Sequence, residues 1–212
     1  MNATDLRAGP VANEIRRLRL ILVLRRIEPQ EKLLALVDEL ADAGARAFEI
    51  TFDSLSAARD IQAIRARLDQ RADGPFLVGA GTVLTRAQLD AARSAGANFG
   101  VAPVLDVEVL RAAVDDGFPF VPAGMTPSEM HVAWSNGATF IKLFPASVAG
   151  PQFIREIRGP FREIEIIPTG GVDASNAQSF LDAGAVAVGV GSAITHMTTD
   201  ERRSFVGSLA AP

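Results

Sequence analysis

Short apolar runs alternate with amphipathic stretches along almost the whole chain. The amphipathic stretches, such as EKLLALVDELADAGA and RAQLDAARSAGA, repeat apolar residues at helical spacing. Several of them close on a glycine, which suits a left-handed helix C-cap. The apolar runs between them have the length and composition of buried strands. We expect eight strands, within residues 20–24, 47–52, 76–83, 99–103, 118–122, 139–144, 163–168 and 186–190.

This repeated strand and helix pattern predicts an α/β fold with a parallel sheet. Near-continuous apolar strands are buried on both faces, and eight such units close most naturally into a (β/α)8 TIM barrel. We expect residues 1–212 to form a single barrel domain, with residues 1–9 as a loose tail and an N-terminal helix over residues 10–19. In such a barrel the functional groups lie at the carboxyl ends of the strands.

Composition narrows the possible functions. The chain of 212 residues has no cysteine and a formal net charge of -4, so it can form no disulfide or thiolate site and has no basic stripe for nucleic acid. No apolar run approaches the roughly 20 residues that span a bilayer, and we expect a cytoplasmic protein without membrane contacts. His131 and His196 lack metal-ligand spacing, so we interpret both as surface residues, His196 in a C-terminal loop, and expect no metal or other cofactor.

The stretch ATFIKLFPA, residues 138–146, places a lysine inside an apolar strand. Alternation puts Phe140, Lys142 and Phe144 on one face. An edge strand, or a side chain that snorkels to the surface, would be a sufficient structural explanation. However, only Lys32 and Lys142 are lysines among the 21 Lys and Arg residues, which indicates that an amine is needed here. A neutral amine can form a Schiff base with a carbonyl, whereas a guanidinium cannot.

Other polar residues end neighbouring strands. Glu49 lies in the apolar strand AFEITF, Arg25 ends the first strand, and Thr82 ends the third on the face of Val78 and Ala80. We expect them to converge with the lysine at one barrel mouth. Glu49 could belong to a structural ion pair. Beside a Schiff-base lysine it would instead shuttle protons, because each step of imine formation and hydrolysis moves one.

Two glycine-bearing segments, PTGGV at residues 168–172 and GVGSAI at residues 189–194, follow the last two expected strands. A Gly-Gly pair alone is more often only a turn. After the seventh and eighth strands of a barrel, however, backbone amides and a helix N-terminus commonly hold a phosphate. Together with the lysine, these segments indicate a phosphorylated keto acid as substrate.

The motifs VLR, EIT, GAGTV, TPSE, KLFPA, GPQF, PTGGV and GVGS resemble, in this order, those of the 2-keto-3-deoxy-6-phosphogluconate (KDPG) and 4-hydroxy-2-oxoglutarate (KHG) aldolase family. The resemblance implies a class I aldolase, commonly a homotrimer, that reversibly cleaves KDPG into pyruvate and D-glyceraldehyde 3-phosphate. It also implies the site residues: Lys142 as the Schiff-base lysine, Glu49 as general acid and base, Arg25 and Thr82 at the pyruvate carboxylate, Pro103 and Phe144 in the pocket wall, and Gly170, Gly171, Gly191 and Ser192 at the phosphate.

Three positions depart from the commonest family pattern. Many members carry an arginine where EITFDS has Asp53, while others place it at the end of the first strand, as Arg25 does here. An SPG-like segment appears as APV at residues 102–104, and a Pro-Gly pair as Pro122-Ala123. The galactonate epimer and unphosphorylated 4-hydroxy-2-oxoglutarate therefore remain open as substrates. A sugar-phosphate isomerase or synthase without an imine, or a non-catalytic binding protein, would be alternatives of another class on the same barrel.

Overall fold

The computed structural model describes residues 3–209 and confirms the predicted parallel α/β arrangement. Six strands form one sheet in the order β5-β4-β3-β2-β1-β8, and β6 and β7 form a second sheet. Every pairing within the two sheets is parallel, and the isolated bridges Ala123↔Lys142 and Thr169↔Gly189 connect the sheets. The strands are β1 Leu20–Leu24, β2 Ala47–Thr51, β3 Leu77–Gly81, β4 Phe99–Val101, β5 Phe120–Val121, β6 Ile141–Leu143, β7 Ile166–Pro168 and β8 Val188–Val190.

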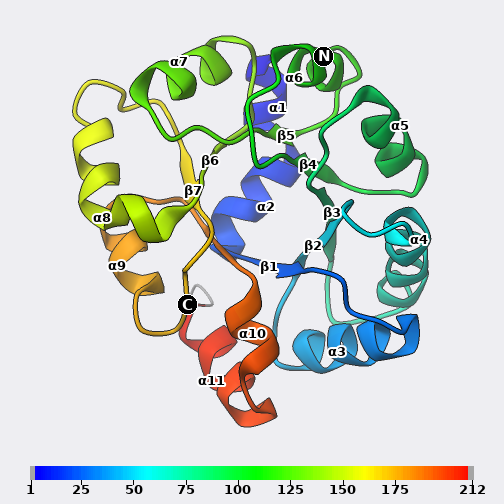
Figure 1. Ribbon diagram of the computed structural model, residues 1–212. Helices are drawn as coiled ribbons and strands as arrows, with labels where there is room; N and C mark the ends of the chain where they lie inside the picture. The colour runs from blue at the N-terminus through cyan, green and yellow to red at the C-terminus, as the bar shows by residue number, and fades with distance from the viewer. Residues whose placement is uncertain (1–2, 210–212) are drawn as a thin grey trace.

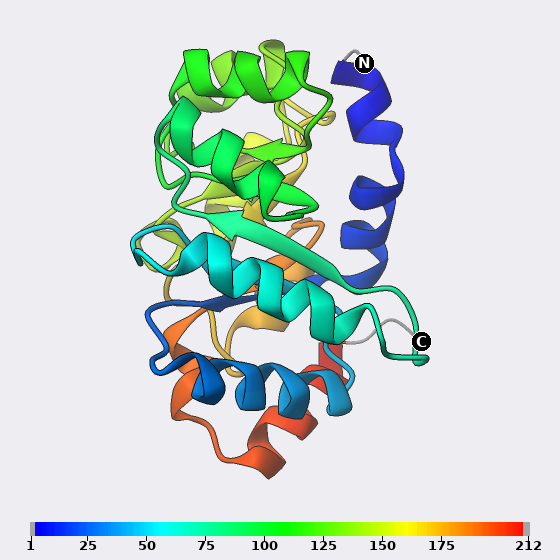
Figure 2. The same ribbon diagram turned by 90° about the vertical axis from the view of Figure 1, so that its right-hand side faces the viewer.

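Helices surround the strands, and α2 crosses one end of them (Figure 1). Residues of α2, among them Ile15, belong to the apolar cluster inside the strands, so this helix covers the end where the strands begin. Figure 2 shows α1 and α2 together along that side of the molecule. The helices are α1 Ala3–Ala8, α2 Pro10–Leu18, α3 Gln30–Asp42, α4 Ala57–Leu68, α5 Arg86–Ser94, α6 Val107–Asp115, α7 Pro127–Ser135, α8 Ala146–Ile157, α9 Ala177–Asp182, α10 Ser192–His196 and α11 Thr199–Leu209.

Strand alternation divides the core into two apolar clusters. One cluster lies between the strands and the helices and includes Ile141 and Leu143. The other lies on the opposite, inner face of the strands and includes Phe140 and Ile167. Because Lys142 alternates with Ile141 and Leu143, its side chain belongs to the inner face, as the sequence predicts.

The expectation that residues 1–9 form a loose tail is wrong for residues 3–8, which form α1; residues 1–2 lie outside the described part of the chain. Leu6 is buried. The Arg7 Nε donates to the carbonyl oxygen of Ala138 at 2.9 Å, and its guanidinium lies 3.5 Å from the centroid of the Trp134 ring. A helix this short is marginal alone, so these contacts with α7 and the following loop stabilise it.

A capping residue sets the start of α7. The segment TPSE offers two hydroxyl side chains there, Thr126 and Ser128. The Thr126 hydroxyl accepts from the Glu129 amide at 3.2 Å, and the Glu129 carboxylate accepts from the Thr126 amide at 2.9 Å. This reciprocal capping box assigns the N-cap to Thr126.

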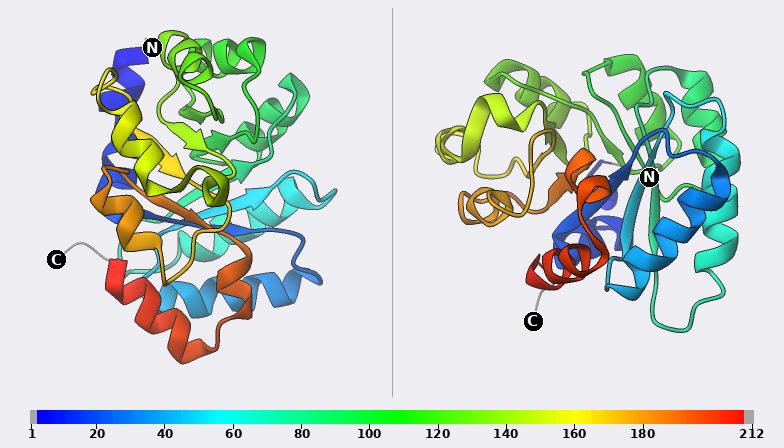
Figure 3. Two further views of the ribbon diagram at one scale, coloured as in Figure 1. Left: turned by 60° about the vertical axis from the view of Figure 1, so that its left-hand side comes forward. Right: turned by 60° about the horizontal axis from the view of Figure 1, so that its bottom comes forward.

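The last helix, α11, lies beside α3 (Figure 3). Arg202 of α11 donates to both carboxylate oxygens of Glu39 at 2.9 and 3.0 Å, and its Nε donates to the carbonyl oxygen of Ile194 at 2.9 Å. Arg202 therefore links α10 and α11 to the third helix.

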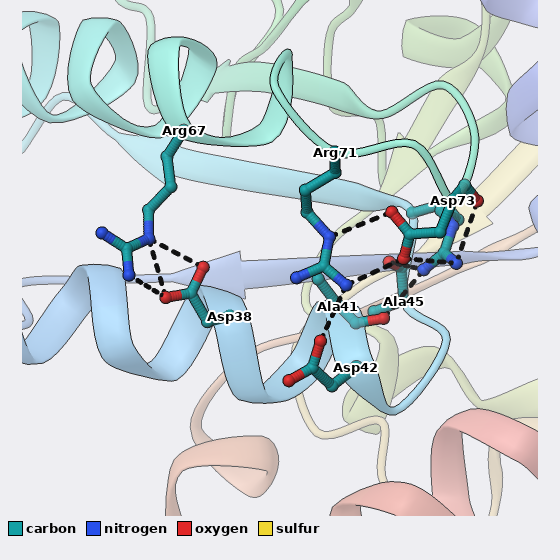
Figure 4. A network of polar contacts seen from close by, with 8 residues as sticks. Asp38, Ala41, Asp42, Ala45, Arg67, Arg71 and Asp73 are labelled. Atoms are coloured by element: carbon teal, nitrogen blue, oxygen red, sulfur yellow. Dashed lines mark hydrogen bonds and ion pairs between the residues drawn. The ribbon is translucent and has the colours of Figure 1, made fainter.

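Exposed ion pairs connect α3, α4 and the loops that precede β2 and β3 (Figure 4). Arg71 contacts Asp42 at 2.7 Å and Asp73 at 2.8 Å, and Arg67 pairs with Asp38. Hydrogen bonds from Arg71 lower the pKa of Asp73 to about 2. Exposed pairs of this kind contribute little individually.

Candidate active site

A pocket of about 680 Å³ opens at the carboxyl ends of the strands. Every predicted site residue except Glu49 lines it, so the structure brings together side chains that are up to 167 positions apart in the chain. The predicted residues in its wall are Arg25, Thr82, Pro103, Lys142, Phe144, Gly170, Gly171, Gly191 and Ser192.

Lys142 lies in the middle of β6 and is 3% exposed. Its amide donates to the carbonyl oxygen of Pro122 at 2.9 Å, and its carbonyl accepts from Gly124 at 3.0 Å, while β7 pairs along the other edge. The Nζ atom lies 5.1 Å from the centroid of the Phe144 ring. Both structural explanations, an exposed edge strand and a side chain that snorkels to the surface, are therefore wrong. Among the described residues no carboxylate forms an ion pair with this amine.

Glu49 lies in the middle of β2, next to Val23 of β1 and Gly79 of β3 in the strand register, and is 2% exposed. Val23, its neighbour in the strand register, lines the pocket, whereas Glu49 itself does not. The Oε1 atom is buried and has no hydrogen-bond partner, which argues against the structural ion pair. Leaving a buried carboxylate oxygen unpaired is costly, and such groups concentrate where chemistry needs them.

Gly81 makes room for this carboxylate. A Cβ atom at residue 81 would lie 2.0 Å from Glu49 Oε1 and 2.7 Å from Cδ, closer than real Cβ contacts allow. Gly81, the second glycine of the GAGTV motif, therefore allows the Glu49 side chain to lie against the backbone of β3.

Thr82 lines the pocket, although strand alternation places it on the opposite face. The expectation that it shares a face with Val78 and Ala80 is wrong, because both of these belong to the outer cluster beneath the helices. Thr82 lies one residue beyond β3 and has a φ of 58°, in the left-handed region that threonine rarely adopts. This turn ends the alternation and places Thr82 in the pocket wall.

Arg25 and Asp53 meet at the edge of the pocket. Nη1 of Arg25 lies 2.8 Å from Oδ2 of Asp53, and Nε of Arg26 lies 3.0 Å from the same oxygen. Burial acts to raise the pKa of Asp53, but the nearby Thr51 hydroxyl and the two guanidinium groups hold that pKa below its usual range. The Thr51 hydroxyl falls short of full hydrogen-bond geometry.

The glycines after β7 adopt a conformation and a spacing that only glycine suits. Gly170 and Gly171 have φ values of 86° and 78°. A Cβ at Gly171 would lie 2.5 Å from the Cβ of Ser147, and one at Gly170 would lie 3.0 Å from the Phe144 ring. The loop after β7 thus passes closely over the start of α8.

The eighth strand brings the start of α10 to the same pocket. Gly191 is the N-cap of this helix and Ser192 its first residue, and both line the pocket. Backbone amides of such loops and helix starts favour anions without any basic side chain.

Sequence reasoning missed several pocket residues, among them His196 and Asp173. His196 is exposed, as predicted, but it ends α10 rather than lying in a loop. Its spacing of four residues from Ser192 is the signal that could have placed both on one helical face. Asp173 accepts from the hydroxyl and amide of Ser175 at 2.6 and 2.8 Å, and these bonds lower its pKa.

Within residues 3–209, no group of three or more His, Cys, Asp or Glu side chains is arranged to hold a metal ion. No helix in the same range has both the length and the apolar composition needed to cross a membrane.

Comparison with known proteins gives one consistent family. The family model for KDPG and KHG aldolase matches residues 11–205. The 2-dehydro-3-deoxy-phosphogluconate aldolase of Pseudomonas aeruginosa is 39% identical over 76% of this chain and 71% of its own. The 2-dehydro-3-deoxy-6-phosphogalactonate aldolase of Escherichia coli (strain K12) is 37% identical over 83% of this chain and 84% of its own. The native KDPGal structure has a TM-score of 0.80 at 33% identity and covers 91% of this chain and 93% of its own.

Proposed function

The chain belongs to the KDPG and KHG aldolase family, and we propose that it reversibly cleaves 2-keto-3-deoxy-6-phosphogluconate through a Schiff base on Lys142. The observation that carries this proposal is the buried, unpaired amine of Lys142 in a pocket whose other walls offer Arg25 and a glycine-rich loop to an anionic substrate. A Schiff base forms when the neutral amine of a lysine attacks a carbonyl carbon.

The reaction begins when Lys142 Nζ adds to the C2 ketone of the substrate and water leaves to form an iminium ion. The C3–C4 bond then breaks, its electrons enter the iminium, and the C4 hydroxyl loses its proton to become the aldehyde of glyceraldehyde 3-phosphate. The remaining enamine is protonated at C3, and hydrolysis releases pyruvate. Glu49 moves these protons through a water molecule, because it is buried beside Val23, which lines the pocket.

The two charged ends of the substrate occupy opposite parts of the pocket. Arg25 and Thr82 bind the carboxylate, next to Lys142, with Pro103 and Phe144 as walls. Gly170, Gly171, Gly191 and Ser192 bind the phosphate through backbone amides and one hydroxyl. The pocket volume of about 680 Å³ suits a small phosphorylated keto acid.

The galactonate epimer is the second candidate substrate. The support for it is that relatives with both names align with the chain at comparable identity. Assaying cleavage of the gluconate and galactonate epimers and of 4-hydroxy-2-oxoglutarate side by side decides the choice, with the highest kcat/KM identifying the substrate.

We further infer three properties of the whole molecule. The two bridges between the sheets support a closed (β/α)8 barrel over the single domain of residues 1–212. The second property is a homotrimer, whose mass would be three times 22.4 kDa and can be measured by sedimentation. The apolar side chain of Val148 is 74% exposed, and a neighbouring subunit could cover it. The third property is a cytoplasmic location.

Reduction with borohydride tests the proposed chemistry. Pyruvate plus borohydride should add one pyruvyl group to Lys142, and Lys142→Arg should abolish the adduct while the circular dichroism spectrum stays unchanged. Lys32, the other lysine of the chain, is the internal control. Labelling at Lys32, or no labelling, would contradict the mechanism and favour an isomerase, a synthase or a binding protein on the same scaffold.

A further inference from the structure

We propose that Asp53 is a positioning residue that orients Arg25 toward the substrate carboxylate, an inference that rests on the proposed function. Asp53 follows Thr51 by two positions at the mouth end of β2, and its side chain is 16% exposed. One of its oxygens, Oδ2, contacts Arg25 at 2.8 Å and Arg26 at 3.0 Å. A single carboxylate atom therefore joins the two consecutive arginines that follow β1.

Arg25 depends on this contact for its orientation. Within residues 3–209, Asp53 is the only group that bonds the Arg25 guanidinium, and the Arg25 side chain is 49% exposed. A long, half-exposed side chain without a partner samples many rotamers and must lose that freedom when it binds a ligand. Because the bond to Asp53 uses Nη1, the guanidinium keeps further N–H donors for a carboxylate.

The backbone at Arg26 supports the same interpretation. Arg26 has a φ of 49°, a left-handed conformation that costs free energy for a residue with a side chain. In an extended chain, consecutive side chains point to opposite faces, but after this turn Arg25 and Arg26 converge on one carboxylate. The negative charge of Asp53 offsets the repulsion between the two guanidinium groups.

The charge state of Asp53 suits this role. Its pKa lies below the usual range, because the two arginines and Thr51 outweigh the effect of burial, so the side chain is ionised at neutral pH. Two arginines and one aspartate leave this group of three with one net positive charge, which favours an anionic substrate. Asp53 therefore holds the arginine that directly follows β1.

Kinetics of Asp53 variants test the proposal. Asp53→Ala should raise KM for the keto acid substrate about three- to thirtyfold, which lies within the range of coupling between contacting residues. Asp53→Asn, which has nearly the same shape, should have a smaller effect in the same direction and serves in place of Asp53→Ala if that variant does not fold. Asp38→Ala removes a comparable exposed ion pair, with Arg67 between α3 and α4, and should leave KM unchanged.

A double-mutant cycle with Arg25→Ala separates positioning from a general structural effect. The readout is the pyruvate concentration that gives half-maximal borohydride trapping, which remains measurable in slow variants. If Asp53 acts through Arg25, adding Asp53→Ala to Arg25→Ala should change this concentration less than twofold. An unchanged KM in both Asp53 variants, or an undiminished effect in the Arg25→Ala background, would overturn the inference. Absence of any adduct in the unaltered protein would instead refute the proposed function.

Discussion

Replacing Gly81 with alanine should displace the Glu49 carboxylate and slow catalysis by about a hundredfold. The added Cβ would lie 2.0 Å from Glu49 Oε1, whereas real Cβ atoms essentially never approach a heavy atom within 3.0 Å. The carboxylate must therefore move by about 1 Å, and a misplacement of this size can cost about a hundredfold in rate. The backbone itself tolerates alanine, since Gly81 does not adopt a left-handed φ.

The stability cost of this substitution should be modest. Adding a methyl group to a filled interior typically costs about 1–3 kcal/mol, and the clashing group is the end of a side chain rather than backbone. Activity would be followed as pyruvate release from the phosphorylated keto acid, and stability as the midpoint of thermal unfolding. The loss should appear mainly in kcat, because the role proposed for Glu49 is to move protons rather than to hold the substrate.

Two other glycines provide matched controls. Gly79 lies in the same strand, and the atoms nearest to a Cβ there would be those of the Phe99 ring, at 2.4 Å, rather than those of Glu49. Gly79→Ala should therefore lose at least as much stability but retain most of its kcat. Gly207→Ala in α11, where nothing lies within 4 Å of the added atom, should change neither. Equal losses of kcat in folded Gly79→Ala and Gly81→Ala would refute the reasoning, because general strain in β3 would then explain both.

Three further substitutions test other parts of the molecule. Arg25→Ala should reduce kcat/KM about ten- to a hundredfold, the range of 1.5–3 kcal/mol for a charge-assisted hydrogen bond; unchanged kinetics would place the carboxylate elsewhere. Ser192→Asp should raise KM more than Ser192→Ala for phosphorylated but not unphosphorylated keto acids, because its charge repels the phosphate; equal impairment of both substrates would contradict the phosphate assignment. Asp73→Asn should lower the unfolding midpoint near neutral pH. Arg71 lowers the pKa of Asp73 from 3.8 to about 2. The difference in unfolding midpoint between the two proteins should therefore shrink as pH falls from 3.8 to about 2, and vanish at lower pH. A difference in midpoint that stays constant with pH would contradict this prediction.

Local patterns in the sequence predicted much of the fold and the location of the site. The period of two in ATFIKLFPA correctly placed Phe140 and Lys142 on the inner face of the strands, and Ile141 and Leu143 on the face that packs against the helices. Alternation is a property of the strand itself. The carboxyl ends of barrel strands lie at one end of the barrel, and this rule correctly predicted that Lys142, Arg25 and the two glycine segments line one pocket. The catalytic roles of these residues and the single-domain boundary stay predictions.

The tertiary structure decided the features that depend on contacts between distant residues or on a local break in regular geometry. The left-handed turn at Thr82 reversed its predicted face, and α1 is a docked helix in which Arg7 contacts Ala138 and Trp134. Neither the empty space that Gly81 leaves for Glu49 nor the meeting of Arg25 with Asp53, 28 positions away, has a periodic signal. A sequence pattern reports which face a residue of a regular strand or helix occupies, whereas the partner of a side chain is determined only when the folded backbone brings the two together in space.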